Sequence, residues 1–320
     1  MPVSPLDFEK PIAELEEQLL QARALPDGEP DREERVRALE AQLEATRGEI
    51  YGRLTPWQRV QIARHPARPH ALDYIRRLIS DWQELRGDRA FGDDKALIAG
   101  LGRLMSRPVA VIGQQKGADV KDNVVRNFGM MHPEGYRKAL RVMRLAEKFR
   151  LPVLVFIDTP GAYPGIGAEE RGQGEAIARN LLALSRLRTP IVCAVIGEGA
   201  SGGALGVGVG DRVLMLQYAW YCVITPEGCA AILWRDPAHA PEAAAALKLT
   251  AEDLLSLGVI DEIVPEPLGG AHRAPIEAAD HLRETLHRHL EELASVSSDE
   301  LLERRYRRYR GVGAPAVVQT

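Results

Sequence analysis

The amino-acid sequence predicts an α/β fold in which a largely parallel sheet is layered with helices. Between about residues 95 and 265, short apolar segments alternate with stretches of helical periodicity, and glycines stand between them. Strands that return after each helix are typical of parallel sheets, because the helix carries the chain back to the starting edge. Ligands of such sheets bind beyond the carboxyl ends of the strands. Three of the apolar segments run into glycine-rich loops there, so we expect a site among those loops.

The first fifty residues differ from this pattern and predict a helical hairpin. Leucine, isoleucine and valine recur there at mostly three- and four-residue steps among Glu, Gln and Arg. The segment 26–31, with its prolines, glycine and acids, ends one helix and starts the next. We interpret the hairpin as architecture that packs on its own domain or on a partner. We therefore divide the chain into an N-terminal helical extension, residues 1–90, and a main domain with C-terminal helices, residues 91–320.

The elements of the main domain follow from where apolar runs, glycines and helical periodicity alternate. Strands are expected at 96–104, 108–113, 151–158, 190–197, 213–216 and 221–224. Helices are expected at 133–148 and 173–186, and two more begin near Ser201 and Pro226. The basic and aromatic segment 304–310 resembles a nucleic-acid patch, but a terminal amphipathic helix that docks on its own complex is favoured.

Composition narrows the class of protein. Hydrophobic residues make up 45% and charged residues 27% of the chain, which is typical of a soluble globular protein. The formal charge of -4 makes nucleic acid an unlikely partner. The three cysteines form no Cys-x-x-Cys pair, so neither a disulfide framework nor a zinc ribbon is expected. Without a signal peptide or a membrane span, we expect a cytoplasmic protein with no membrane contact.

The glycine segment that follows the expected strand at 190–197 permits three interpretations. Gly197-x-Gly199-x-x-Gly202 has the dinucleotide-binding spacing, but no acid stands about twenty residues on to hold a ribose. Gly199-x-Ser201-x-Gly203 has the spacing of a serine-hydrolase nucleophile. Its partners would come from Asp253, Asp261, His272 and His281. Alternatively Ser201 caps the next helix, and the N–H groups of Gly202 and Gly203 form an oxyanion hole.

Long motifs in this chain closely resemble the α subunits of bacterial acetyl-CoA carboxylase carboxyltransferases. The motifs that carry the resemblance are 6–12, 63–66, 126–130, 156–165, 167–173, 197–210, 224–234 and 265–273. The resemblance spans nearly the whole chain. It implies a crotonase-like spiral core of ββα units with an N-terminal helical extension.

The resemblance also implies a reaction and a set of partners. The carboxyl group of carboxybiotin, held on a biotin carboxyl carrier protein and loaded by biotin carboxylase, passes to acetyl-CoA and gives malonyl-CoA, the first committed step of fatty acid synthesis. The site is expected between this chain and a β subunit that carries the zinc, in an α2β2 tetramer, with no metal on this chain. A serine hydrolase and a non-catalytic assembly scaffold remain the alternatives.

The family's site residues map onto this sequence as follows. Gly202 and Gly203 are expected to stabilise negative charge on the ureido oxygen of biotin, after which the released biotin enolate deprotonates acetyl-CoA. The loop Gly161, Ala162, Tyr163, Pro164 and Gly165, together with Gly199, is expected to shape the pocket. Lys116, Lys121 and Arg126 are expected either to attract anionic substrate or to form a solvated surface. Ala200 stands where the family usually has glycine, and its methyl group is tolerated if φ is negative.

Overall fold

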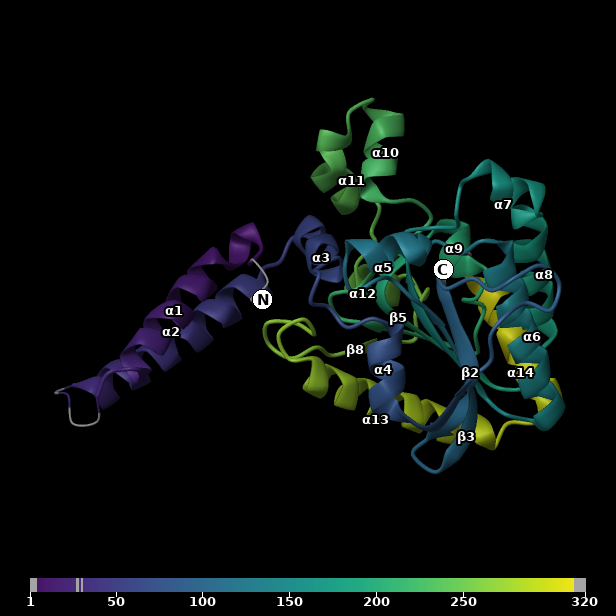
Figure 1. Cartoon of the computed structure of the whole chain (residues 1–320), viewed down its shortest axis with the longest axis horizontal. Helices are drawn as coiled ribbons and strands as arrows, with labels where there is room; N and C mark the ends of the chain where they lie inside the picture. The colour runs from purple at the N-terminus through teal and green to yellow at the C-terminus, as the bar shows by residue number, and fades with distance from the viewer. Residues whose placement is uncertain (1–4, 27–28, 30, 314–320) are drawn as a thin grey trace, which may run out of the picture.

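The computed structural model describes residues 5–26, 29 and 31–313, which form an eight-stranded sheet flanked by helices (Figure 1). The strands are β1 (Ile79–Glu84), β2 (Leu97–Leu104), β3 (Arg107–Gln114), β4 (Val153–Thr159), β5 (Ile191–Ala200), β6 (Arg212–Leu216), β7 (Trp220–Cys222) and β8 (Glu262–Val264). The helices are α1 (Lys10–Arg23), α2 (Arg32–Gly52), α3 (Pro56–Ala63), α4 (Ala71–Leu78), α5 (Val120–Val125), α6 (Pro133–Phe149), α7 (Ile166–Glu170), α8 (Gln173–Arg186), α9 (Ser201–Leu205), α10 (Pro226–Leu233), α11 (Ala240–Ala246), α12 (Ala251–Ser256), α13 (Pro275–Ala294) and α14 (Ser298–Gly311). Short 3-10 turns lie at Asp7–Glu9, Asn127–Gly129 and Pro237–His239.

The sheet is antiparallel at one edge and parallel elsewhere. Its strand order is β1-β2-β3-β4-β5-β6-β8, and β7 pairs with the end of β5. Only the β1–β2 and β2–β3 pairs are antiparallel, so the predicted, largely parallel α/β sheet is confirmed. Every residue of β4 and β5 is buried, because both faces of the central strands are covered. The carboxyl ends of β3, β4 and β5 therefore meet at one edge.

The expected elements are found with their ends shifted by three residues or fewer, and α8 spans the predicted residues 173–186. The strand pair 96–104 and 108–113 is the hairpin β2–β3, which turns at Met105 with a φ of 53°. The helix expected near Ser201 has only five residues. The edge strands β1 and β8 were not predicted from the sequence. β1 precedes residue 91 yet belongs to the main sheet, and the domain boundary at residue 90 stays a prediction.

The two N-terminal helices lie side by side and project from the body of the molecule (Figure 1). They share a small core of their own that contains Ile12, Leu15, Leu19, Leu39 and Leu43. The expected helical hairpin is thereby confirmed. Because its apolar stripes are used within the hairpin, most of the exposed surface of α1 and α2 is charged.

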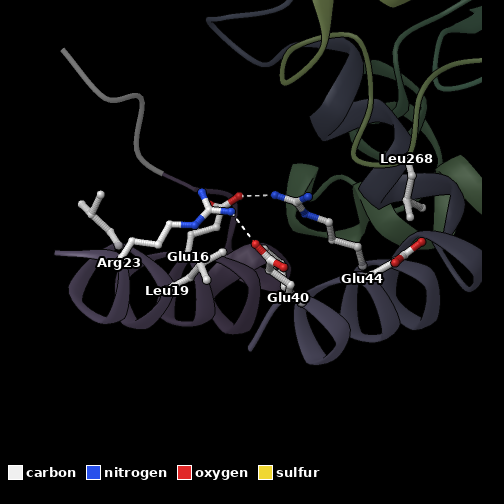
Figure 2. Close-up of a pocket in the computed structure, with 9 residues that line it drawn as sticks. Glu16, Leu19, Arg23, Glu40, Glu44 and Leu268 are labelled. Carbon is white, nitrogen blue, oxygen red and sulfur yellow. Dashed lines mark hydrogen bonds and ion pairs between the residues drawn. The ribbon is translucent and has the colours of Figure 1, made fainter. Parts of the chain in front are cut away.

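The outer part of the hairpin is tied together by ion pairs. Arg23 contacts Glu40 at 2.6 Å, and Arg47 contacts Glu16 at 2.5 Å. Figure 2 shows these residues around a cavity of about 590 Å³, to which Leu268 of the main domain also contributes. Arg273 Nη1 also donates to Glu16 Oε1 at 2.7 Å, so the hairpin contacts the main domain along α1 as well as at its base.

The base of the hairpin is fixed by one buried carboxylate. Glu9 accepts hydrogen bonds from Tyr51 Oη at 2.6 Å and from Arg273 Nε at 3.0 Å, and it contacts His272 Nε2 at 3.2 Å. The ring of His272 stacks on His65 with centroids 4.2 Å apart. Burial opposes ionisation of Glu9, but the hydrogen bonds from His272 and Tyr51 hold its pKa well below its usual range. One carboxylate thus joins both ends of the hairpin to the main domain.

The C-terminal helix α14 is clasped to the main domain by a buried arginine. The Arg305 guanidinium pairs with Asp211 at 2.7 Å and donates to the carbonyl oxygens of Leu184, Leu187 and Thr189. The expected terminal helix therefore docks on its own chain. Among the described helices, none combines the length and the apolar character that a membrane crossing requires.

Candidate active site

The glycine loops that follow β4 and β5 touch each other backbone to backbone. A Cβ atom at Gly203 would lie 2.3 Å from the carbonyl carbon of Gly161 and 2.7 Å from the nitrogen of Ala162. No side chain fits there, so glycine is required at 203 by this close approach. The structure thus brings together three predicted site residues that the sequence separates by about forty positions.

The two glycines also leave free space beside this contact. Gly161 has a φ of 152°, which favours glycine, and a Cβ there would meet no atom within 4 Å. A Cβ at Gly202 would find Ile177 at 3.5 Å, an ordinary contact, and Gly202 is partly exposed. The contact therefore has one packed side and one open side.

The first turn of α9 presents unpaired backbone donors. Ser201, Gly202 and Gly203 are its first three residues, so no carbonyl of the helix precedes them by one turn. Within the described residues, no hydrogen bond is formed by the N–H of Gly202 or of Gly203. These N–H groups and the dipole of the short helix favour negative charge at this position.

Ser201 does not have the capping role expected from its position. Ala200 is the N-cap residue, and no side chain caps α9. Ser201 is exposed, has a φ of 56°, and its hydroxyl forms no hydrogen bond within the part of the chain that the structure describes. Ala200 is buried with a φ of -112°, which confirms that its methyl group is tolerated.

The residues proposed as partners of a serine nucleophile are bound elsewhere. His272 contacts Glu9 at the hairpin base, and His281 contacts the carbonyl oxygen of Pro265 at 3.1 Å. The Asp261 carboxylate accepts the N–H of Val213 at 2.6 Å. The fold therefore assembles no Ser–His–Asp triad around Ser201, and the hydrolase interpretation finds no support.

The segment 163–165 is held as a rigid wall of the loop. The Tyr163 ring stacks on His132 with centroids 4.1 Å apart, and a Cβ at Gly165 would lie 2.4 Å from that ring. Gln173 Nε2 donates to the Tyr163 carbonyl oxygen at 3.0 Å, while Pro164 is exposed. Thr159 Oγ1 accepts the N–H of Gly161 at 3.1 Å and so fixes the start of the same loop.

Gly199 pairs with Thr159 of β4 and with Tyr221 of β7. A Cβ there would meet the Tyr221 ring at 2.8 Å, so Gly199 serves the pairing of β5 with β7. This packing explains why glycine stands at 199, while its role in the pocket stays a prediction.

Lys116 is half-buried in a network of ion pairs. Its Nζ lies 2.6 Å from both Asp158 Oδ1 and Glu198 Oε2, and His70 Nδ1 lies 2.9 Å from the other Asp158 oxygen. Burial disfavours the ammonium, but the two carboxylates outweigh it and raise the pKa of Lys116. Burial likewise opposes ionisation of Asp158, yet Lys116 and His70 lower its pKa. Lys116 is thus held by ion pairs and not solvated as a free surface residue, and its role toward substrate stays a prediction.

The other two predicted cations lie on α5 or at its end. Arg126 is partly buried and is held by Asp122 at 2.9 Å and by the carbonyl oxygen of Lys95 at 3.0 Å. Lys121 is exposed, and its role toward substrate stays a prediction.

A second ion-pair group was missed by sequence reasoning. Arg64 binds Glu198 at 2.6 Å and also pairs with Glu227 of α10, and its guanidinium lies 5.7 Å from the Trp220 ring centroid. This group ties α10 to the end of β5. The motifs at 63–66 and 224–234 contain the partners, but nothing in the sequence shows that segments so far apart meet.

One cluster has the residue types of a metal site. Glu9, His65 and His272 each place a donor atom within 4.8 Å of the others. Glu9, however, already accepts from the Arg273 guanidinium, and His65 Nδ1 accepts the N–H of Ala67 at 3.2 Å. A dication beside that guanidinium would be repelled, so we assign the cluster to fixing the hairpin.

A family model and individual relatives of this chain indicate the same kind of protein. Residues 5–313 match the family described as acetyl co-enzyme A carboxylase carboxyltransferase-like. The chain is 56% identical over 309 residues to the acetyl-coenzyme A carboxylase carboxyl transferase subunit alpha of Thioalkalivibrio sulfidiphilus, covering 96% of this chain and 97% of the relative. It is 57% identical to that subunit of Prochlorococcus marinus (strain MIT 9515), covering 96% and 92%.

Solved structures show the same fold at low identity. The transcarboxylase 12S structure with methylmalonyl-coenzyme A superposes with a TM-score of 0.58 at 20% identity, covering 72% of this chain and 42% of that chain. A Pseudomonas malonate decarboxylase hetero-tetramer in complex with coenzyme A gives 0.55 at 20% identity, covering 67% and 86%. These likenesses confirm the expected crotonase-like α/β fold.

Proposed function

The chain belongs to the acetyl-coenzyme A carboxylase carboxyltransferase α-subunit family, and from this we propose that the first turn of its α9 supplies the oxyanion hole for carboxyl transfer. It is a carboxyltransferase of fatty acid synthesis, with acetyl-CoA as substrate and a biotin-linked carboxyl donor. We infer further that the donor is carboxybiotin on a biotin carboxyl carrier protein loaded by biotin carboxylase in the cytoplasm. The product is then malonyl-CoA.

The observation that carries this proposal is the contact of Gly203 with Gly161 and Ala162 beside unpaired N–H groups. When bound, the biotin group supplies the transferable carboxyl group and a ureido oxygen on which negative charge develops. The N–H groups of Gly202 and Gly203 donate to that oxygen and stabilise the charge. The open side of Gly161 and the partly exposed Gly202 leave room for such an oxygen, so the residues fit the group.

Packing keeps these donors in place without any rearrangement during the reaction. Gly203 is locked against the 161–162 backbone, and Thr159 fixes Gly161. Donors that are already oriented cost little reorganisation when charge appears, which is why such sites accelerate reactions strongly. Tyr163 and Pro164 are inferred to form the wall that orients the biotin group.

The family is multi-subunit, and we infer that the β subunit docks over the carboxyl ends of the strands. α5, α7, α9 and α10 lie on the upper side of the body in Figure 1. They expose apolar side chains there, including Val120 at 78%, Ile166 at 79% and Ile232 at 71%. Exposed apolar side chains gathered at one end of a molecule are typical of an interaction surface. A zinc-carrying β subunit covering it, in an α2β2 tetramer, would enclose the donors of α9.

The test is malonyl-CoA decarboxylation with biocytin as carboxyl acceptor, measured in a coupled assay. We expect no turnover by the chain alone or by a β subunit alone, and turnover when both are mixed. The Ile232→Asp variant should need more β subunit for half-maximal rate if α10 is part of the docking face. As a control, the same β subunit is assayed with the α subunit of Thioalkalivibrio sulfidiphilus, a close relative, to establish that this β subunit is active. Activity of the purified chain alone, or inactivity with that competent β subunit, would contradict the proposal.

A further inference from the structure

We propose that Gln114 is a positioning residue that sets the spacing between the two glycine segments of the oxyanion hole. This inference rests on the proposed function of Gly202 and Gly203. Gln114 ends β3 and is fully buried, with 0% of its surface exposed. Gln114 takes no part in the catalytic role proposed for the glycines. Its residue type and its place in the sequence do not indicate a positioning role.

The Gln114 amide uses its two ends in two different segments. Its Nε2 donates to the carbonyl oxygen of Gly203 at 2.8 Å, in the first turn of α9. Its Oε1 accepts the N–H of Asp158 at 3.2 Å, in the last residues of β4. Because one end must donate and the other must accept, only an amide side chain of this length satisfies both partners.

This bridge lies where it controls the oxyanion hole. Gly161 follows Asp158 by three residues, and Gly203 packs on Gly161 with no space to spare. In a helix the carbonyl groups point toward the C-terminus and the N–H groups toward the N-terminus. A hydrogen bond to the Gly203 carbonyl oxygen holds the peptide group that follows Gly203 and so, through the helical backbone, restrains the direction of the Gly203 N–H. Loss of the bridge would let the α9 turn rotate or separate from the loop after β4.

The neighbouring residue supplies a matched control. Gln115 is also buried, at 4% exposed, and its amide also bridges two backbone groups. Its Oε1 accepts the N–H of Leu72 at 2.7 Å, and its Nε2 donates to the carbonyl oxygen of Lys116 at 2.6 Å. Gln115 thus holds α4 and its own loop and contacts neither glycine segment. The same substitution at 115 measures the cost of a buried carboxyl group without touching the α9 turn.

The decisive variant is Gln114→Glu, which keeps the shape of the side chain but replaces its donor by an oxygen. The ionised carboxylate faces the Gly203 carbonyl oxygen with no hydrogen to share, so the turn is released. The protonated carboxyl group regains a donor. Burial of the side chain at 114 favours that protonated form, which places the titration within reach of an assay. The activity of the variant relative to the wild type should therefore rise as the pH is lowered.

The experiment compares Gln114→Glu, Gln114→Met and Gln115→Glu with the wild type, each in complex with the β subunit. In the malonyl-CoA decarboxylation assay we expect kcat to fall by about 10- to 100-fold for both Gln114 variants, less than the ~10²–10³ typical for loss of a whole donor. KM of the Gln114 variants should stay within about twofold of the wild-type value, because loss of a contact made only in the transition state lowers kcat and leaves substrate binding unchanged. Gln115→Glu should retain most of kcat. Only Gln114→Glu should recover at low pH.

Three outcomes would overturn the inference: full kcat in both Gln114 variants, an equal loss of kcat in Gln115→Glu, or a Gln114→Glu activity ratio that does not change with pH. Circular dichroism confirms that each variant is folded, and Gln114→Met decides the kcat comparison if the buried carboxylate prevents folding. An inactive wild-type complex would instead count against the proposed function itself, so the two failures are distinguishable.

Discussion

The edge of the sheet and the base of the N-terminal hairpin are both organised by a buried carboxylate, but they differ in what finally sets their geometry. Asp158 and Glu9 are each ionised and bound by two or more donors. At the sheet edge, the critical contact is between the backbones of Gly161 and Gly203. At the hairpin base, the contacts of Glu9 with Tyr51, His272 and Arg273 are made by side chains. A backbone contact has no rotamers with which to adjust, so we expect the sheet edge to be intolerant and the hairpin base to be tunable.

The largest effect should come from Gly203→Ala. The new methyl group would lie 2.3 Å from the Gly161 carbonyl carbon, so the two loops must separate. We expect a loss of at least ~100-fold in kcat, as when an oxyanion donor is misplaced, measured in the reconstituted complex. Gly174→Ala on α8 is the control, because a Cβ there meets no atom within 4 Å. An active Gly203→Ala complex would show that the contact between the loops is not needed.

An intermediate effect is expected at the hairpin base when the pH is lowered. Burial, with His272 next in importance, lowers the pKa of His65 from 6.5 to about 4. The unfolded chain therefore binds this proton first, and the free energy of unfolding should decrease as the pH falls from about 6.5 to 4. The share due to His65 is of order 2–3 kcal/mol at most. Urea unfolding at a series of pH values measures it.

The His65→Asn variant isolates the part of the pH-dependent free energy of unfolding that His65 contributes. Glu9 acts in the same direction but mainly below its ordinary pKa of 4.5, because its pKa in the folded protein is lowered. Asp94 acts in the opposite direction, since burial raises its pKa to about 6 and acid then favours the folded state. Both contributions remain in the His65→Asn protein. Parallel pH profiles of the two proteins would mean that His65 does not carry the effect.

The smallest effect should come from Ser201→Ala. The hydroxyl caps nothing, is exposed and has no partner among the described residues, so kcat and stability should change little, within ~0.5 kcal/mol as for other surface positions. Ser201→Gly should be slightly stabilising, because its φ of 56° suits glycine. Thermal unfolding and the decarboxylation assay measure both variants. A folded but inactive Ser201→Ala protein would restore the nucleophile interpretation.

The sequence predicted the positions of the helices and strands better than the contacts between them. Apolar runs and glycines located the central strands and the limits of α8, because burial on both faces imposes a continuous apolar run. The resemblance predicts Gly202 and Gly203 as site residues, and that role stays a prediction. The contact of Gly203 with Gly161 joins two loops about forty residues apart, and no local pattern records such an approach.

Polar residues just after the strands were the main source of error. Lys116 follows a strand in a glycine-rich segment, where a cation is usually exposed. It is half-buried because it forms ion pairs with Asp158 and Glu198 on two other strands. Ser201 has the right residue type for an N-cap, but the strand β5 continues to Ala200 and moves the cap one residue earlier. In both cases the tertiary arrangement overrides the local preference.

The bonds that Arg305 makes to Asp211 and to three carbonyl oxygens can form only late in synthesis of the chain. The carbonyl oxygens of Leu184, Leu187 and Thr189 leave the ribosome more than one hundred residues before their donor does. A nascent chain that ends before α14 carries these acceptors and the Asp211 carboxylate without their partner, and such groups are costly to bury. Docking of the last helix therefore completes the hydrogen bonds and the ion pair of this region. We expect prematurely terminated chains to remain open near the end of α8 and to be removed by proteases, while full-length chains close and persist.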